Sequence, residues 1–306
     1  MQEGSRKAIL AAFFANAAIA VAKFFGFLVT GASSMLAESV HSVADSTNQG
    51  LLLLGGSRAR RVATPEHPFG YGRERYFWSF VVALVIFTLG SLFALYEGFE
   101  KLRHPHELES VGVAVAILVV AIGFETWSLG TAIRESRRSK GSQSWWSFIR
   151  HSKSPELPVV LLEDIGAMAG LVFALTGVGL AEVTGNPRWD AAGTLVIGVL
   201  LGVIAVVLIV EMKSLLLGEG ASPATVATIR RIMEEHPSVR RVIHMRTQHL
   251  GPEELLVGAK VELDPALTGA GLASAIDSVE SAVRAQVPDA RVMYLEPDVS
   301  QEPVAG

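Results

Sequence analysis

The sequence contains no cysteine among its 306 residues, so disulfide frameworks and thiolate metal sites are excluded. Charged residues are also scarce: they make up 18% of the chain, against about 25% in an average globular protein. The net charge of -4 shows no basic excess, which gives no support for a nucleic-acid partner. Half of the residues are hydrophobic, which is an apolar surplus for a chain with so few charges.

The apolar surplus lies in the part of the chain before Gly218, in blocks of about 20 residues, which is the length that a bilayer requires. Six membrane spans are predicted, over residues 8–30, 34–56, 76–99, 111–133, 158–183 and 191–212. The sequence therefore predicts an all-α six-helix transmembrane bundle that occupies residues 1–217 and lies in a lipid bilayer.

The lysines and arginines between the spans predict the orientation of this bundle. One side has only Lys101, Arg103 and Arg188, and the other side has most of the basic residues, including the cluster at 134–140. Both chain termini are therefore expected in the cytoplasm, as an even number of spans requires. Span one has no small-residue cleavage site, which favours a retained helix in a bacterial inner (cytoplasmic) membrane.

Residues 218–306 have the composition of a soluble domain. Ser222 and Pro223 are typical of a helix start, and the helix is expected to run to about His236. Strands are predicted at 239–250, 255–263 and 291–295, with a helix at 272–287 between the last two. This α-β-β-α-β order predicts a small ferredoxin-like α+β domain.

Span two carries polar residues where a membrane helix should be apolar. Glu38, His41, Asp45 and Asn48 are spaced by three, four and three residues, so they share one helix face. One imidazole with carboxylates suits zinc, and less exclusively manganese, iron or cobalt. The alternative is a hydrogen-bond network with only a structural role, at a high cost in lipid.

Span five has two adjacent carboxylates, Glu163 and Asp164, in an otherwise apolar helix. Consecutive helical residues are about 100° apart, so at most one of the two points directly at span two. The other is expected at the flank of the site, or beside a water-filled cavity where it binds nothing.

Several motifs occur in the order found in one transporter family. They are GASSMLAESVHSVAD at 31–45, HPFGYGRE at 67–74, PVVLLEDIGA at 158–167 and Asp190. With these motifs the chain resembles the cation diffusion facilitator family of divalent-metal/proton antiporters, in the branch that includes the animal mitochondrial zinc transporter. The resemblance implies a cytoplasmic tail that dimerises, and a tetrahedral metal site formed by spans two and five.

The implied site is only partly matched. His41 and Asp45 correspond to the family's pair on span two, and Asp164 to the second member of the pair on span five. Val160 stands where the family has a histidine, so Glu163 is the expected fourth ligand. Glu38 and Asn48 are possible additional ligands. In the loop, His67 is expected in a structural turn, and the tail histidines are not expected to form a zinc cluster.

The expected function is export of a divalent metal ion from the cytoplasm in exchange for protons, by a homodimer without a resident cofactor. Zinc is the first candidate, and manganese, iron or cobalt are further ones. A proton-coupled organic cation carrier is an alternative, and an intramembrane metal-dependent enzyme is a remote one. No HExxH motif and no nucleophile with a base is present, and no phosphate-binding GxxxxGK[ST] loop occurs.

Overall fold

The computed structural model describes the backbone of residues 3–108 and 110–298, with the side chains of 17–108 and 110–298. The chain divides into two compact units. The first comprises the chain up to Arg58 together with Arg75–Lys213, and the second comprises Ala59–Glu74 and everything from Ser214 onward. The loop at 59–74 thus belongs with the tail rather than with the helices that it connects.

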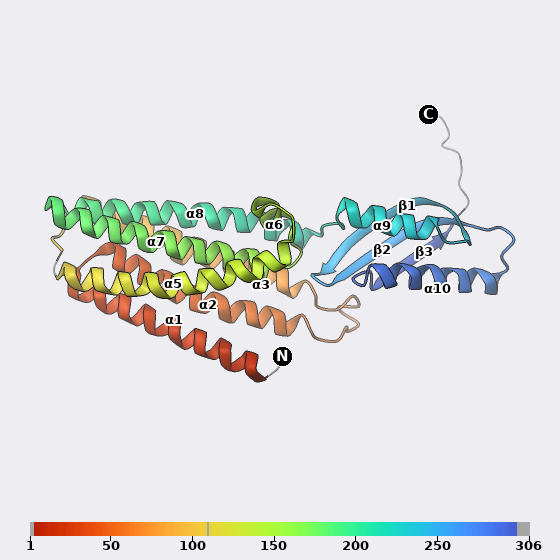
Figure 1. Cartoon of the computed structure of the whole chain (residues 1–306), viewed down its shortest axis with the longest axis horizontal. Coiled ribbons are helices and arrows are strands. Elements are labelled where there is room, and N and C mark those ends of the chain that lie inside the picture. The colour runs from red at the N-terminus through yellow and green to blue at the C-terminus, as the bar shows by residue number, and fades with distance from the viewer. Residues whose placement is uncertain (1–2, 109, 299–306) are drawn as a thin grey trace, which may run out of the picture. The chain divides into compact units, whose positions relative to one another are not determined.

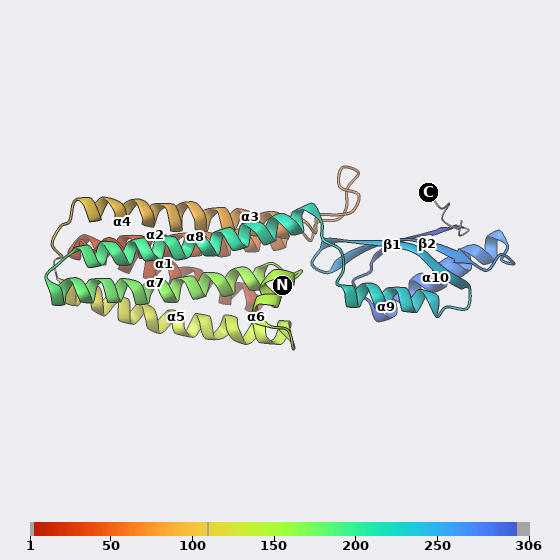
Figure 2. The same cartoon turned by 90° about the horizontal axis from the view of Figure 1, so that it is seen from above.

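The first unit is all-helical, and its long helices run along a common direction (Figures 1 and 2). They are α1 (Glu3–Thr30), α2 (Ser33–Arg58), α3 (Glu74–Val85), the π-helix η1 (Ile86–Leu92), α4 (Phe93–Arg103), α5 (Val111–Lys140), α6 (Trp145–His151), α7 (Glu156–Thr184) and α8 (Arg188–Leu217). The short α6 was not predicted. Its first turn is capped by the Ser144 hydroxyl, which accepts a hydrogen bond from the Ser147 amide at 3.1 Å.

Within the described residues, four helices are long and apolar enough to cross a membrane: Glu74–Arg103, Val111–Lys140, Glu156–Thr184 and Arg188–Leu217. The described part of α1, Ala17–Thr30, is a shorter apolar helix. The predicted spans fall on the observed helices, with the fourth continuing from the expected end near 133 to Lys140. Because Arg, Glu and Lys are good helix formers, the helix extends beyond its apolar part.

Four helices enclose a common interior. Helix α1 packs against α2 and α5, and α7 packs against the same two helices. The apolar part of this interior contains Met35, Leu118 and Leu171, which are all completely buried. Polar side chains on the inward faces of α1, α2, α5 and α7 are therefore brought together.

The start of α2 is fixed by a buried acid from α8. The Asp190 carboxylate accepts hydrogen bonds from the Ser33 amide at 2.8 Å and the Ser33 hydroxyl at 2.9 Å, and from Ser34 as well. An anion is favourable at a helix N-terminus. Lys101 donates to the Gly31 carbonyl at the end of α1, and its ammonium lies 3.9 Å from Asp190. This cluster ties α1, α2, α4 and α8 together at one end of the bundle.

The tail contains α9 (Pro223–Glu234), β1 (Val239–Gly251), β2 (Glu254–Leu263), α10 (Gly269–Gln286) and β3 (Val292–Pro297). Strands β1 and β2 form an antiparallel hairpin in which Val242 is opposite Val261, and β3 pairs parallel with β2. The predicted start of α9 is confirmed, because the Ser222 hydroxyl accepts from the Thr225 amide at 3.1 Å.

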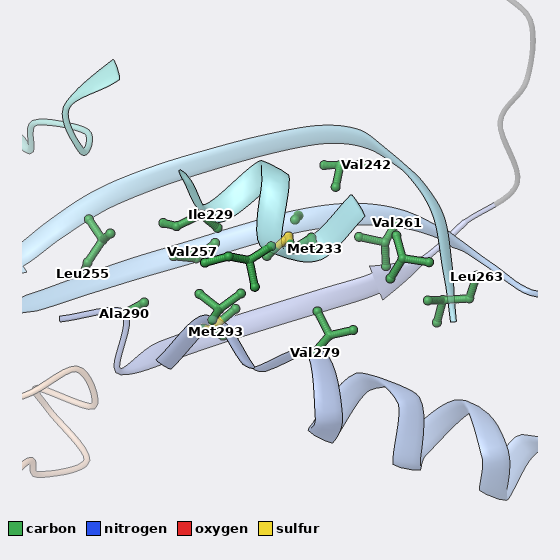
Figure 3. Close-up of a cluster of buried hydrophobic side chains, with 14 residues drawn as sticks. Ile229, Met233, Val242, Leu255, Val257, Val261, Leu263, Val279, Ala290 and Met293 are labelled. Carbon is green, nitrogen blue, oxygen red and sulfur yellow. The ribbon is translucent and has the colours of Figure 1, made fainter. Parts of the chain in front are cut away.

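Alternate residues of β2 form the centre of the tail's core, as the period of a half-buried strand requires. Both helices cover the same face of the sheet. Figure 3 shows the resulting cluster, which includes Ile229 and Met233 of α9, Leu255, Val257 and Val261 of β2, Val279 of α10 and Met293 of β3.

Candidate metal site

The polar stripe of α2 lies inside the helix bundle. Glu38 and Asn48 are completely buried, His41 is 1% exposed and Asp45 is 8% exposed. Because α2 is helical over all four positions, they share one face as predicted, and along this face Glu38 meets α1, His41 lies beside η1 and Asn48 meets α7. Because of this polar stripe, α2 is not apolar enough to be one of the four helices that could cross a membrane by composition, although it lies beside them.

The two acids of α7 have different partners. Glu163 is buried, and its Oε1 accepts a hydrogen bond from the Asn48 amide at 3.0 Å. Asp164 accepts from the Ser128 hydroxyl of α5 at 3.1 Å, and it acts electrostatically on both His41 and Asp45. Glu163 thus faces α2 directly, whereas Asp164 lies toward α5.

Several buried polar atoms of the stripe lack a hydrogen-bond partner within the described residues. They are Oε1 of Glu38, both ring nitrogens of His41, Oδ1 of Asp45 and Oδ1 of Asn48. His41 Nδ1 lies 3.5 Å from Asp45 Oδ1, which is too long for a good hydrogen bond. Buried polar atoms are normally satisfied, so unpartnered lone pairs on an imidazole and a carboxylate mark a place where a cation fits.

The π-helix passes beside this imidazole. A methyl group added at Gly90 of η1 would lie 3.9 Å from His41 Nδ1 and 3.1 Å from Leu201. Gly90 therefore leaves room for the ring, and π-helical turns are frequent at functional sites. No sequence signal predicted this segment.

The structure does not assemble a finished coordination shell. Among the residues that it describes, no three His, Asp or Glu side chains come together closely enough to hold one metal ion. Asn48 and Ser128 hold the two acids of α7 instead. Coordination by His41, Asp45 and Asp164 would thus need side-chain rotation at the α2–α7 contact.

Glu38, a possible additional ligand by sequence, pairs with a lysine of α1. Lys23 donates to Glu38 Oε2 at 3.0 Å and to the Ser42 hydroxyl at 2.8 Å, and both charged side chains are completely buried. The signal for this pair was present in the sequence, because Lys23 is the one charged residue that interrupts span one between 8 and 30. It did not reveal which acid the lysine meets.

The contribution of α5 to this region was not predicted from the sequence. Ser128 holds Asp164, and Glu125, one turn earlier, acts electrostatically on Asp45 and Asp164. The available signal was a single acid in the middle of an otherwise apolar span.

The loop at 59–74 forms a compact turn. Thr64 and Tyr71 share a hydrogen bond of 3.1 Å through their hydroxyl groups, and the His67 ring lies 4.6 Å from the Tyr71 ring. Gly70 has a positive φ of 78°, as expected for a tight turn. In the tail, His236 meets the Ser278 hydroxyl at 2.9 Å.

Comparison with known proteins gives two adjacent family matches. The cation efflux transmembrane domain matches residues 9–217, and the cation efflux protein cytoplasmic domain matches 221–294. The mitochondrial proton-coupled zinc antiporter SLC30A9 of Mus musculus is 36% identical over 265 residues, which are 86% of this chain and 47% of that protein. Metal tolerance protein C4 of Arabidopsis thaliana is 28% identical over 262 residues, 85% of this chain and 57% of that protein.

A probable cation efflux system protein of Mycobacterium tuberculosis, MT2084, is 29% identical over 242 residues, 78% of this chain and 67% of that protein. The chain spans about half the length of the mouse antiporter. The transmembrane match covers more than half of the chain, and it coincides with the buried polar stripe and the apolar helices described above. The chain is a multi-pass membrane protein and belongs to the cation efflux family.

Proposed function

We propose that the protein is a secondary transporter that exports a divalent metal ion in exchange for protons. His41, Asp45 and Asp164 bind the ion, with Glu163 as the fourth ligand. The observation that carries this proposal is the set of unpartnered lone pairs on His41 and Asp45, buried in the bundle and facing the acids of α7. The names of the relatives from mouse and Arabidopsis agree with a metal cargo.

Zinc is the first candidate for the cargo. One imidazole with several carboxylate oxygens is a less exclusive zinc site than two imidazoles, so manganese, iron and cobalt should compete. The ions are cargo, and the proposal includes no resident cofactor.

Protons are the proposed counter-ion because they compete with metal for the same lone pairs. In the proposed cycle, the deprotonated site loads metal from the cytoplasm and then opens to the other side. External protons displace the ion by binding to His41 and one carboxylate, and the protonated site returns. The proton gradient drives the cycle.

The arrangement in the membrane is also a proposal. Residues 1–217 form six spans, with α1 and the polar α2 as the first two, and residues 218–306 form a ferredoxin-like cytoplasmic domain. Both termini lie in the cytoplasm, and the protein resides in the inner cell membrane as a homodimer held by its tail. The mouse relative, by contrast, carries the word mitochondrial in its name.

The test is metal flux into proteoliposomes with a pH-sensitive dye inside. Wild-type protein should move zinc with opposite proton flow, and Asp45→Asn should abolish both. Thr47→Val is the matched control, because Thr47 is exposed on the same turn of α2 and donates a hydrogen bond to the Val43 carbonyl of its own helix at 2.9 Å. Amine flux without metal flux would favour the organic cation carrier, and metal flux without proton flow would refute the antiport mechanism.

A further inference from the structure

Helix α5 has one inward stripe, and an acid lies within it. Ala114, Leu118, Ala121 and Ser136 are the buried residues of this helix, and the first three are spaced by four and three residues, which marks one face. Glu125 follows Ala121 by four residues and continues this stripe, and Ser128 follows Glu125 by three. The carboxylate of Glu125 is therefore directed to the bundle interior rather than to lipid.

One contact locates this part of the stripe beside α7. Ser128 donates to Asp164 at 3.1 Å, so this turn of α5 faces the acid of α7. Glu125 lies one turn before Ser128 on the same stripe, and the charges within electrostatic range of it are those of Asp45, Lys23, Asp164 and Glu38. Glu125 is therefore near two of the proposed cargo ligands, Asp45 and Asp164.

No hydrogen bond or ion pair of the Glu125 carboxylate occurs among the described residues. Lys23 is the only basic group among the charges that act on it, and its ammonium already donates to Glu38 at 3.0 Å and to Ser42 at 2.8 Å. An acid inside a membrane bundle is expensive without a cation or a partner. The position of Glu125 therefore calls for a cation that the described residues do not supply.

A second observation points to a ligand at the same place. His41 is 1% exposed, and neither ring nitrogen has a hydrogen-bond partner in the described part of the chain. An unpartnered, buried imidazole one helical turn from Asp45, and within electrostatic range of Asp164, is a stronger indication of a cation site than acids alone.

We propose that Glu125 is a specificity-determining cargo ligand, which adds an oxygen from α5 to the site that α2 and α7 form. The inference rests on the proposed function. Zinc accepts four ligands readily, whereas manganese favours six oxygen-rich ones. An additional carboxylate therefore benefits manganese more than zinc, and Glu125 accounts for a broader range of cargo than the other four ligands alone would give.

The test compares equilibrium binding and flux of Mn²⁺ and Zn²⁺ for wild type and Glu125→Gln. Loss of the charged oxygen should raise the Kd and KM for Mn²⁺ about 10-fold, and those for Zn²⁺ about 2-fold to 3-fold. Thr126→Val is the control, because Thr126 is exposed on the same turn and bonds its own helix at 2.7 Å. An unchanged Mn²⁺/Zn²⁺ ratio in Glu125→Gln overturns the inference.

A shorter acid keeps the test decisive if the amide variant does not fold. Glu125→Asp retains the charge but withdraws it by one methylene, so a smaller shift of the ratio toward Zn²⁺ is expected, and no shift overturns the inference. Failure of the proposed function is recognised separately, because wild-type protein would then bind and move neither ion.

Discussion

The buried ion pair between α1 and α2 makes a quantitative prediction. Replacing Lys23 with Met removes the charge and keeps a side chain of similar length. Glu38 then loses the 3.0 Å contact with the ammonium while it stays completely buried, and Ser42 loses its 2.8 Å partner. Glu38 Oε1 already lacks a hydrogen-bond partner in the described residues, so no other contact compensates.

The expected cost follows from this geometry. Breaking a buried ion pair by removing one partner typically costs about 3–5 kcal/mol, because a charge remains buried and alone. The lost bond to the Ser42 hydroxyl adds about 1 kcal/mol. Removing both charges avoids the penalty, so Lys23→Met/Glu38→Gln should lie within about 1 kcal/mol of wild type. The coupling energy between the two positions should therefore be at least about 2 kcal/mol.

The assay is unfolding by SDS in mixed micelles, followed by far-ultraviolet circular dichroism. Lys213→Met is the control, because Lys213 is exposed on α8 and its replacement should change the free energy of unfolding by less than about 0.5 kcal/mol. If Lys23→Met behaves like this control, or if the double variant is no more stable than the single one, the pair does not stabilise the bundle as argued.

Three further predictions concern other parts of the chain. Asp190→Asn should lower the free energy of unfolding in the same assay by about 2–3 kcal/mol, because α2 loses a charged cap; an unchanged midpoint would refute this. Val160→His should raise the preference for Zn²⁺ over Mn²⁺ in flux competition, and an unchanged ratio would count against this position. Hydrogen bonds to Asp298 and Glu296 raise the pKa of Lys260 above its ordinary value of 10.5. The stabilisation that these bonds give is complete below pH 10.5 and is lost as the pH rises through the pKa of Lys260 in the folded protein. Lys260→Met should remove this part of the alkaline fall in the thermal midpoint between about pH 9 and about pH 12, and an identical fall would refute it.

Much of the fold could be predicted because it depends on local patterns. Apolar blocks of the right length mark the helices at 74–103, 111–140, 156–184 and 188–217, and a serine–proline pair marks the start of α9. The short helix at 145–151 escaped prediction because seven residues with two tryptophans give no clear period. The same lack of a local signal hid the π-helix, whose extra residue per turn depends on the neighbouring helices.

The candidate site was predictable on α2 and less so elsewhere. The spacing from Glu38 to Asn48 determines a common face whatever surrounds the helix. Which partner each acid meets depends on how helices dock, and no pattern within one helix encodes that. Lys23 and Glu125 each gave the same weak signal, a single charge in an apolar span. Only the neighbouring helices show that Lys23 is paired with Glu38, whereas Glu125 has no hydrogen-bond partner among the described residues.

This bundle contains two kinds of buried polar group. They differ less in residue type than in whether their polar atoms have hydrogen-bond partners. Where α1 ends and α2 begins, both Asp190 oxygens accept hydrogen bonds. Lys101 donates to a carbonyl oxygen and lies beside the Asp190 carboxylate, so the cluster is rigid without a ligand. Around His41, lone pairs on the imidazole and on Asp45 are open, and the low dielectric that strengthens a complete network penalises an incomplete one. A cation that binds there removes that penalty. In the proposed function, part of the binding energy for the cargo therefore comes from polar groups that the fold leaves unsatisfied, and side-chain movement is expected at this level of α2 rather than at its capped start.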